Sequence, residues 1–332
     1  MESRTERKEK MIRRSYMKKY LSILMIAAML IGTTACSSGT NASSQTPSSQ
    51  AGSSEAASSE AVSSEAGVTG SCTISGSSAL YPLVKNALDA FKQKNPDASV
   101  TLNAGGSGTG LKQSADGTVD IGMSDVFADE KLTEDQAKTL VDHKVCVITM
   151  APIVNADVAE KVTSLTTQQL TDIFTAKTKN WKEVGGPDEP ITLVTRPSTS
   201  GTRALFKSYA LNGADEASNK SLETDDSGTL LQTVSQHKGA IGYVALSYLI
   251  QPNENIKTMA IDGVEPTLEN TYAGKYKVWG YEHMYTKGDA AGVAKALIDY
   301  MQSDEYGKIM EGLGYNVASK MTVERQDPGP KK

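Results

Sequence analysis

The stretch VCVITMAPIV, residues 145–154, is almost entirely apolar and rich in β-branched side chains. This pattern predicts a strand that is buried on both faces. A similar run, YKVWGYEHMY at residues 276–285, precedes a helical C-terminal stretch at residues 290–310. We interpret the two runs as strands that cross from one lobe to another and back, which predicts a chain of two lobes. A single doubly wound domain is the alternative.

The segments around these two runs alternate between strand and helix patterns from residue 69 onward. Short β-branched runs predict strands at residues 72–74, 99–102, 119–123, 191–194 and 240–244. Apolar residues at helical spacing predict helices at residues 83–91, 110–115, 165–174 and 204–209. Alternation of this kind is typical of an α/β fold with a mainly parallel sheet.

The 332 residues carry a formal net charge of −5 at pH 7. A nucleic-acid-binding protein usually has a basic face that neutralises backbone phosphates, so this balance argues against a nucleic-acid partner. The three histidines and three cysteines show neither metal-ligand spacing nor a disulfide framework. We therefore expect no metal and no cofactor, and we expect Cys72 and Cys146 to be separate buried thiols.

Residues 1–35 have the pattern of a signal peptide, with basic side chains, an apolar run at residues 21–31 and then small residues. That run is too short for a bilayer span, which takes about 20 residues. Cys36 follows Thr34 and Ala35, and this ending resembles a bacterial lipobox. We expect export, cleavage before Cys36 and attachment of a lipid such as palmitate to Cys36. Ordinary secretion is the alternative.

Residues 36–68 consist almost entirely of Ser, Ala, Gly, Glu, Thr and Gln, with a five-residue repeat that contains Ser-Ser-Glu-Ala. The segment lacks the large apolar side chains that offset the entropy of ordering a chain. We predict a flexible tether that keeps the folded part near a membrane surface.

Three turns rich in Gly, Ser and Thr each lie between a predicted strand and a predicted helix, at residues 76–79, 105–110 and 198–202. Each places free backbone N–H groups at a helix start, where the helix dipole favours an anion. One such turn is more often an ordinary helix cap, but three in one chain predict an anion site. The middle turn lacks the Lys of a P-loop and the glycine spacing of a dinucleotide site, which argues against nucleotide binding.

Two charged residues complete the predicted site. Arg196 precedes the third turn and can form two parallel hydrogen bonds to an oxyanion. Asp125 follows a predicted strand. Because an ionised carboxylate only accepts hydrogen bonds, it can accept one from protonated phosphate but repels sulfate. The alternative is a structural role, with Asp125 as a helix cap or surface residue and Arg196 in a salt bridge to it.

Seven segments between about residues 70 and 320 resemble the phosphate-binding subunit of the Pst-type ABC importer. They are GSSALYP at residues 76–82, GSGTG at 106–110, DIGMSD at 120–125, QLTDIF at 169–174, NWKEVGG at 180–186, RPSTSGT at 196–202 and GAIGYV at 239–244. The resemblance implies a two-lobed α/β fold of the type II periplasmic-binding-protein class, with two crossover strands forming a hinge. We expect residues 69–152 and 277–325 to form lobe I and residues 153–276 to form lobe II.

The resemblance also implies a set of phosphate-binding residues. By position, Ser107 and Thr202 would donate hydroxyl groups, Arg196 would clamp the anion and Asp125 would accept the proton of phosphate. Ser78 would add a hydroxyl, with backbone N–H groups from the residues that follow it. The full set is Ser78, Ala79, Leu80, Ser107, Asp125, Arg196, Ser200, Gly201 and Thr202.

The implied function is capture of inorganic phosphate by lobe closure and its delivery to the permease and ATPase subunits of an ABC importer, by a monomer anchored at the outer face of the bacterial cell membrane. We expect no enzyme activity, because neither Ser78 nor Ser200 lies in a G-x-S-x-G elbow and no histidine is placed to act as a base. The alternatives are a binding protein for another tetrahedral oxyanion, such as sulfate or molybdate, and a surface sensing or adhesion protein.

Overall fold

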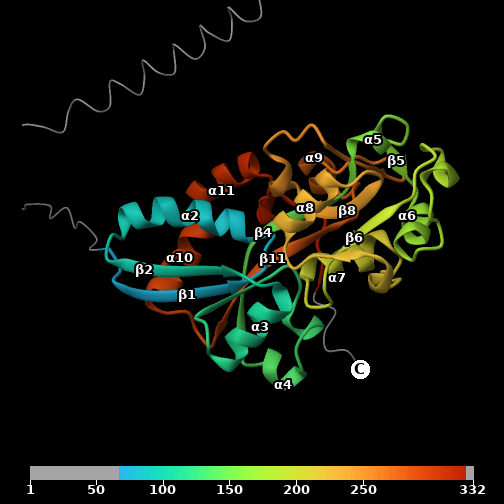
Figure 1. The fold of residues 1–332 in the computed structure, drawn as a ribbon. Helices are drawn as coiled ribbons and strands as arrows, with labels where there is room; N and C mark the ends of the chain where they lie inside the picture. The colour runs from blue at the N-terminus through green and yellow to red at the C-terminus, as the bar shows by residue number, and fades with distance from the viewer. Residues whose placement is uncertain (1–66, 327–332) are drawn as a thin grey trace, which may run out of the picture. The chain divides into compact units, whose positions relative to one another are not determined.

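A mixed sheet of nine strands organises residues 67–326, the part of the chain that the computed structural model describes (Figure 1). Its strand order is β2-β1-β3-β11-β4-β8-β6-β7, and β9 pairs with β4 outside this path. A separate pair joins β10 to β5. The signal peptide, Cys36 and nearly all of the tether predicted from the sequence lie outside the described residues.

The strand bounds are β1 (Gly70–Gly76), β2 (Ala98–Ala104), β3 (Ile121–Ser124), β4 (Leu140–Asn155), β5 (Ser164–Leu165), β6 (Thr192–Thr195), β7 (Leu222–Glu223), β8 (Ala240–Ala245), β9 (Ile256–Thr258), β10 (Ala260–Ile261) and β11 (Trp279–Lys287). The helix bounds are α2 (Tyr81–Lys94), α3 (Ser107–Asp116), α4 (Glu134–Ala137), α5 (Ala156–Ala159), α6 (Thr167–Phe174), α7 (Gly201–Ala210), α8 (Ser227–Gln236), α9 (Leu268–Tyr272), α10 (Gly292–Met301) and α11 (Asp304–Met310). Single 3-10 turns occupy Ala128–Glu130, Trp181–Val184, Ser218–Lys220, Leu246–Leu249, Glu311–Leu313 and Ala318–Lys320.

The expectation of a mainly parallel sheet is wrong. Parallel pairs occur in the two outer parts of the sheet, where β1 pairs with β2 and β3, and β6 pairs with β7 and β8. The central strands β4 and β11 run antiparallel to each other and to their other partners in the sheet. The reason is connectivity: β4 carries the chain out of one lobe and β11 brings it back, so the two strands run in opposite directions.

The long strand β4 belongs to both halves of the sheet. Its first part, from Leu140 to Thr149, pairs with β11, and its second part, from Met150 to Val154, pairs with β8. The burial pattern of β4 is continuous from Val145 to Val154, as the apolar run predicted. We propose that residues 69–152 and 277–325 form lobe I and that residues 153–276 form lobe II, with the bounds expected from the sequence.

Local signals set the helix limits. The helix α3 begins at Ser107, three residues before the predicted start, because Gly106 adopts φ +82° and turns the chain directly into the helix. The C-terminal stretch forms two helices rather than one continuous helix. The hydroxyl of Ser303 accepts a hydrogen bond from the N–H of Tyr306 and so caps a new helix, α11.

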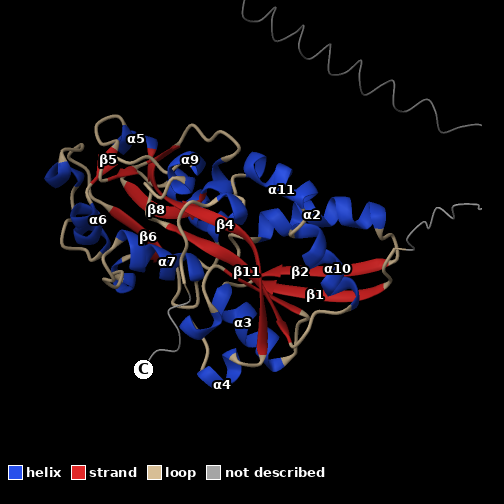
Figure 2. Cartoon of the chain, turned by 180° about the vertical axis from the view of Figure 1, so that it is seen from behind, coloured by secondary structure: helices blue, strands red, loops and turns tan. Residues whose placement is uncertain are grey.

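The helices cover both sides of the lobe I sheet. Helices α2, α10 and α11 lie together on one side, and α3 lies on the other (Figure 2). Cys72 and Cys146 are both buried and both free, so the prediction of two separate thiols is confirmed. None of the described helices is long and apolar enough to cross a membrane.

The end of the described chain lies against both the crossing strand and lobe II. The guanidinium carbon of Arg325 lies 3.4 Å from the ring centroid of Tyr209 in α7 and 3.9 Å from that of Trp279 in β11. Arg325 also donates hydrogen bonds to the carbonyl groups of Trp279 and Lys277. These contacts join the C-terminal segment to the sheet.

Candidate anion-binding site

Loops from the two lobes meet directly at the predicted site. The N–H of Gly108 in lobe I donates a hydrogen bond of 2.9 Å to the carbonyl oxygen of Thr199 in lobe II. The Tyr248 hydroxyl donates a bond of 2.6 Å to the carbonyl oxygen of Ser78. Lys131 donates across the same junction to the carbonyl oxygens of Ser198 and Ser200, at 2.8 and 3.3 Å. The two lobes are therefore closed on each other around this region.

Gly201 shows how closely the lobes approach. A Cβ atom built on Gly201 would lie 2.2 Å from Ser107 Oγ and 2.9 Å from the Cβ atom of Asp125. Gly201 is not among the positive-φ glycines, so the contact and not the backbone angle demands glycine here. This contact brings the third turn of lobe II against the second turn and Asp125 of lobe I.

Arg196 is fully buried, and carbonyl groups fix its orientation. Its Nε donates to the carbonyl oxygen of Thr224 at 3.0 Å, and its Nη2 donates to that of Asp225 at 2.8 Å. Its Nη1 faces the hydroxyls of Thr202 and Ser227, at 3.3 and 3.1 Å. The guanidinium is thus held in place by lobe II and directs its remaining donors toward the other site residues.

A cluster of buried hydroxyl groups surrounds the Nη atoms of Arg196. Ser78 Oγ lies 3.0 Å from Ser227 Oγ and accepts a bond of 3.3 Å from Arg196 Nη2. Ser200 Oγ lies 2.7 Å from Thr202 Oγ1. Hydroxyl groups can each donate one hydrogen bond and rotate to suit a ligand, so the cluster is a set of adjustable donors.

Ser227 is a member of this cluster that the sequence reasoning missed. It is the first residue of α8, and the side chain of Asp226 before it caps that helix. The sequence Asp226-Ser227-Gly228-Thr229 is a fourth small-residue turn ahead of a helix, so the signal was present. The starts of α3, α7 and α8 thus supply Ser107, Gly201 and Ser227, whose backbone groups lie at the positive ends of the helix dipoles.

The first turn differs from the expectation in one respect. The N–H groups of Ala79 and Leu80 donate to the hydroxyl oxygen of Ser77, at 3.1 and 3.0 Å. The Leu80 side chain lies in the core of lobe I. The two predicted backbone donors are therefore engaged by Ser77 in this structure, while Ser78 lies in the hydroxyl cluster.

Asp125 is buried at the end of β3, with 2% of its surface exposed. Its N–H donates to Ser107 Oγ at 3.0 Å, which leaves the hydroxyl proton of Ser107 available to another acceptor. Its Oδ1 accepts no hydrogen bond from the described residues. Burial raises the pKa of Asp125, whereas the Ser77 hydroxyl, the charge of Arg196 and the Ser107 hydroxyl lower it.

The structural alternative of an ion pair between Asp125 and Arg196 is not observed within residues 67–326. The site combines many donors with a single acceptor, an arrangement suited to an oxyanion that carries a proton. None of the three histidines lies in it: His143 bonds to Thr286, His237 to Thr233 and His283 to Asp142. The described part of the chain has no cluster of metal-ligating side chains.

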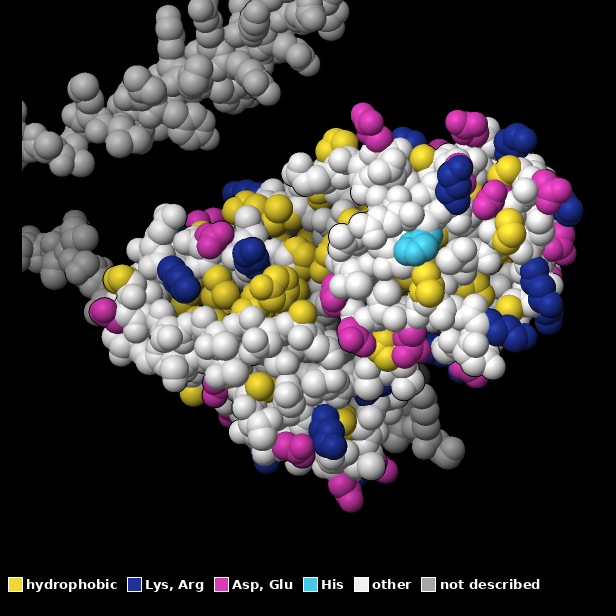
Figure 3. Space-filling view, in the orientation of Figure 1, with side chains coloured by type: hydrophobic (Ala, Val, Ile, Leu, Met, Phe, Trp, Pro, Cys, Tyr) yellow, Lys and Arg dark blue, Asp and Glu magenta, His cyan; other side chains and the backbone are white. Residues whose placement is uncertain are grey.

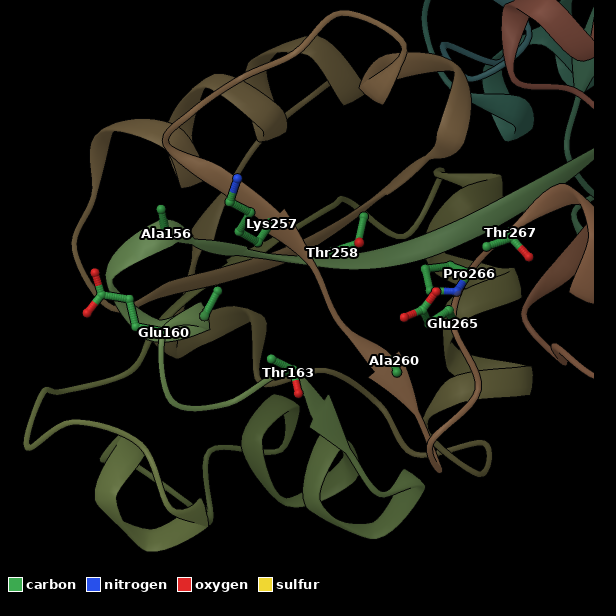
Figure 4. Close-up of a pocket in the computed structure, with 10 residues that line it drawn as sticks. Ala156, Glu160, Thr163, Lys257, Thr258, Ala260, Glu265, Pro266 and Thr267 are labelled. Atoms are coloured by element: carbon green, nitrogen blue, oxygen red, sulfur yellow. The ribbon is translucent and has the colours of Figure 1, made fainter.

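A surface pocket of about 450 Å³ lies elsewhere, in lobe II (Figure 4). Three charged side chains line it, Glu160, Lys257 and Glu265, and all three are exposed. It contains none of the residues predicted to bind the anion. Across the face shown in Figure 3, basic and acidic side chains are interspersed.

Comparisons with known proteins agree on one family. A family model described as a PBP superfamily domain matches residues 61–305. The phosphate-binding protein PstS of Bacillus subtilis (strain 168) is 44% identical over 313 residues, which cover 94% of this chain and 98% of that protein. A crystal structure of a putative phosphate ABC transporter substrate-binding protein with bound phosphate, from Clostridium perfringens, gives a TM-score of 0.68 at 32% identity, covering 75% of this chain and all of that one. An ABC-type phosphate transport receptor from Vibrio cholerae gives 0.59 at 27% identity, covering 74% of this chain and 99% of that one.

Proposed function

Since the chain belongs to the PBP superfamily and to the family of PstS phosphate-binding proteins within it, we propose that it captures inorganic phosphate between its lobes and delivers it to an ABC importer. It is a binding protein and not an enzyme. Membership of this family confirms the two-lobed α/β fold class expected from the sequence.

One observation supports phosphate as the ligand of this chain. The cluster of buried hydroxyl donors also contains one buried cation and one buried carboxylate. Arg196 supplies positive charge with a fixed orientation, and Asp125 supplies the one carboxylate. At neutral pH phosphate keeps at least one proton and can donate it to Asp125, whereas sulfate cannot. We propose the nine residues expected from the sequence as the phosphate-binding set, with Ser227 as a tenth member. Ala79 and Leu80 would take part by turning their N–H groups from the Ser77 hydroxyl to the anion.

The test is a titration of the purified chain with phosphate and with sulfate, by calorimetry, repeated on Asp125→Asn. We expect the original chain to bind phosphate and not sulfate. In the variant we expect phosphate affinity to fall roughly tenfold or more and sulfate binding to appear, because the amide can donate to sulfate.

Asp97→Asn is the matched control, because Asp97 is exposed and the substitution makes the same change in charge. It should leave both titrations unchanged. Failure of the original chain to bind phosphate, or equal binding of sulfate, would remove the proposed function.

Proteins of this family work outside the cytoplasm. We propose that this chain is held there by a lipid on Cys36, since the lipobox-like ending precedes a segment with the composition of a tether. We propose that it works as a monomer, because one chain supplies both lobes of the site.

The lipid makes a prediction of its own. Mass spectrometry of the protein from bacterial membranes should show a mature chain that begins at Cys36 and carries acyl groups. Cys36→Ser should release the protein from the membrane fraction without changing phosphate affinity. A mature chain that begins elsewhere, with an unmodified Cys36, would contradict the anchor and leave phosphate binding untouched.

A further inference from the structure

A second carboxyl group lies behind the proposed phosphate acceptor. Glu282 is on the crossing strand β11 and has no exposed surface. In the antiparallel pairing of β11 with β3, His283 lies opposite Ser124. If this register is continued by one residue, Glu282 lies opposite Asp125. The two side chains are therefore neighbours.

Three of the four oxygens of these two carboxyl groups are buried without a hydrogen-bond donor among the described residues. Both oxygens of Glu282 and the Oδ1 of Asp125 are buried and accept no hydrogen bond from the described residues. Two ionised carboxylates are acceptors only and cannot bond to each other, but a proton on one of them creates a donor. Two buried carboxyl groups this close share a proton, because like charges in a low-dielectric interior repel.

Among the described residues, no cation contributes to the pKa of Glu282. Cys146 lies opposite it on β4, and burial raises the pKa of that thiol, with the charges of Glu282 and Asp125 adding to the effect. Tyr315 is the other titratable neighbour, and burial raises its pKa too. Burial, and then the charge of Asp125, raises the pKa of Glu282 well above its usual value.

Asp125 has different neighbours, because Arg196 contributes a positive charge on its side of the pair. The two carboxyl groups therefore differ: Asp125 faces a cation and the hydroxyl cluster, whereas no cation acts on Glu282 among the described residues. Besides the thiol, the phenol and Asp125, the neighbours of Glu282 include the Ser77 hydroxyl, which lowers its pKa against the larger effect of burial. The shared proton is more stable on Glu282.

We propose that Glu282 is a positioning residue for phosphate recognition: it holds a proton, donates it in a hydrogen bond to one oxygen of Asp125, and so keeps the other oxygen ionised to accept from phosphate. This inference rests on the proposed function. The pair carries one proton and one negative charge, and no covalent bond other than O–H is involved. Without Glu282, the buried Asp125 would take up a proton itself and become a donor, which sulfate could use.

The proposal predicts how binding depends on pH. Since burial raises the pKa of Glu282 well above its usual value, its proton is lost only at a pH well above the one at which a glutamic acid ordinarily ionises. Loss of this proton leaves two negative charges facing the anion. Phosphate affinity should then fall about tenfold for each pH unit above the pKa of the pair.

The experiment compares Glu282→Gln and Glu282→Met with the original chain by calorimetry between about pH 7 and about pH 10, over which phosphate keeps at least one proton. The glutamine amide donates to Asp125 at every pH, so this variant should keep its affinity within about threefold across the range. The methionine variant has no donor, so its phosphate affinity should be roughly tenfold weaker or more at neutral pH and it should bind sulfate. Glu254→Gln, at an exposed glutamate, is the control and should follow the original chain.

The possible results distinguish a failure of the proposed function from a failure of the proposed role of Glu282. If the original chain fails to bind phosphate at neutral pH, the proposed function fails. If it binds phosphate but Glu282→Gln shows the same alkaline loss, or Glu282→Met still rejects sulfate, the role of Glu282 is overturned. Infrared spectra with carboxyl-labelled glutamate add a direct readout. Burial also raises the pKa of Glu216 to about 7, so the band of Glu282 is the protonated glutamic acid band that is present in the original chain and lost in Glu282→Gln; no such difference at neutral pH overturns the proposal.

Discussion

Replacing Arg196 by methionine is expected to weaken phosphate binding severely. The guanidinium is the buried cation of the site, and its orientation is set by hydrogen bonds to the carbonyl oxygens of Thr224 and Asp225. Truncating one partner of a buried, hydrogen-bonded charge pair costs about 2–5 kcal/mol, which is about 30- to 5,000-fold in affinity. Calorimetric titration with phosphate measures the loss.

Arg196→Lys is the matched variant, because it keeps the positive charge and loses the planar fork. A lysine cannot reach both carbonyl groups and the hydroxyl cluster at once, so we expect an affinity between those of the original chain and the methionine variant. Circular dichroism should show that both variants keep their secondary structure. Phosphate affinity within threefold of the original chain in Arg196→Met would show that Arg196 is a structural residue of lobe II.

Adding a single methyl group at Gly201 should produce the second large effect, by preventing closure. In Gly201→Ala the new Cβ would meet Ser107 and Asp125 of the other lobe, at 2.2 Å from Ser107 Oγ. Overpacking of this kind costs about 1–3 kcal/mol, so phosphate affinity should fall about 5- to 150-fold. The clash is between lobes, and each lobe can keep its own fold.

The control for this variant is Gly312→Ala, because nothing lies within 4 Å of a Cβ atom at that position. It should bind phosphate as the original chain does. Small-angle scattering with saturating phosphate should show a larger radius of gyration for Gly201→Ala than for either of the other two proteins. Normal affinity and normal compaction in Gly201→Ala would mean that the lobes meet differently when phosphate is bound.

The crossing strands could be predicted from the sequence because their signal is local. The apolar run at residues 145–154 is buried along its whole length, as its composition requires. Their opposite directions follow from the predicted crossing out and back, but that they pair with each other could not be predicted, since pairing depends on which segments meet after a long excursion through the other lobe. Alternating strands and helices are typical of parallel sheets, so this pattern suggested a mainly parallel sheet. The pattern gives the order of the elements along the chain, but it does not give the direction in which β11 runs next to β4.

Part of the site could also be predicted from the sequence, because its signal is local too. Small-residue turns before helices led to Ser107, Ser200 and Gly201, which the structure brings together. Glu282 could not be found this way, because one acidic residue within an aromatic, apolar strand carries no sign of what it faces. Its relation to Asp125 arises from strand register, which joins residues far apart in the chain.

The position of β11 in the sheet also determines the order in which the protein can fold. This strand lies between β3 and β4, and it is the last strand of the described chain in sequence order. Until it arrives, lobe I consists of separate pieces and β3 has an unpaired edge, whereas every strand that pairs within lobe II is already present. Pairing across such long separations is slow, so we expect folding to pass through a stage in which lobe II is complete and lobe I still lacks its central strand. Residues 279–326 therefore complete the sheet of lobe I. A chain that ends before them would leave the edge of β3 unpaired, and an unpaired edge can pair with another chain and lead to aggregation.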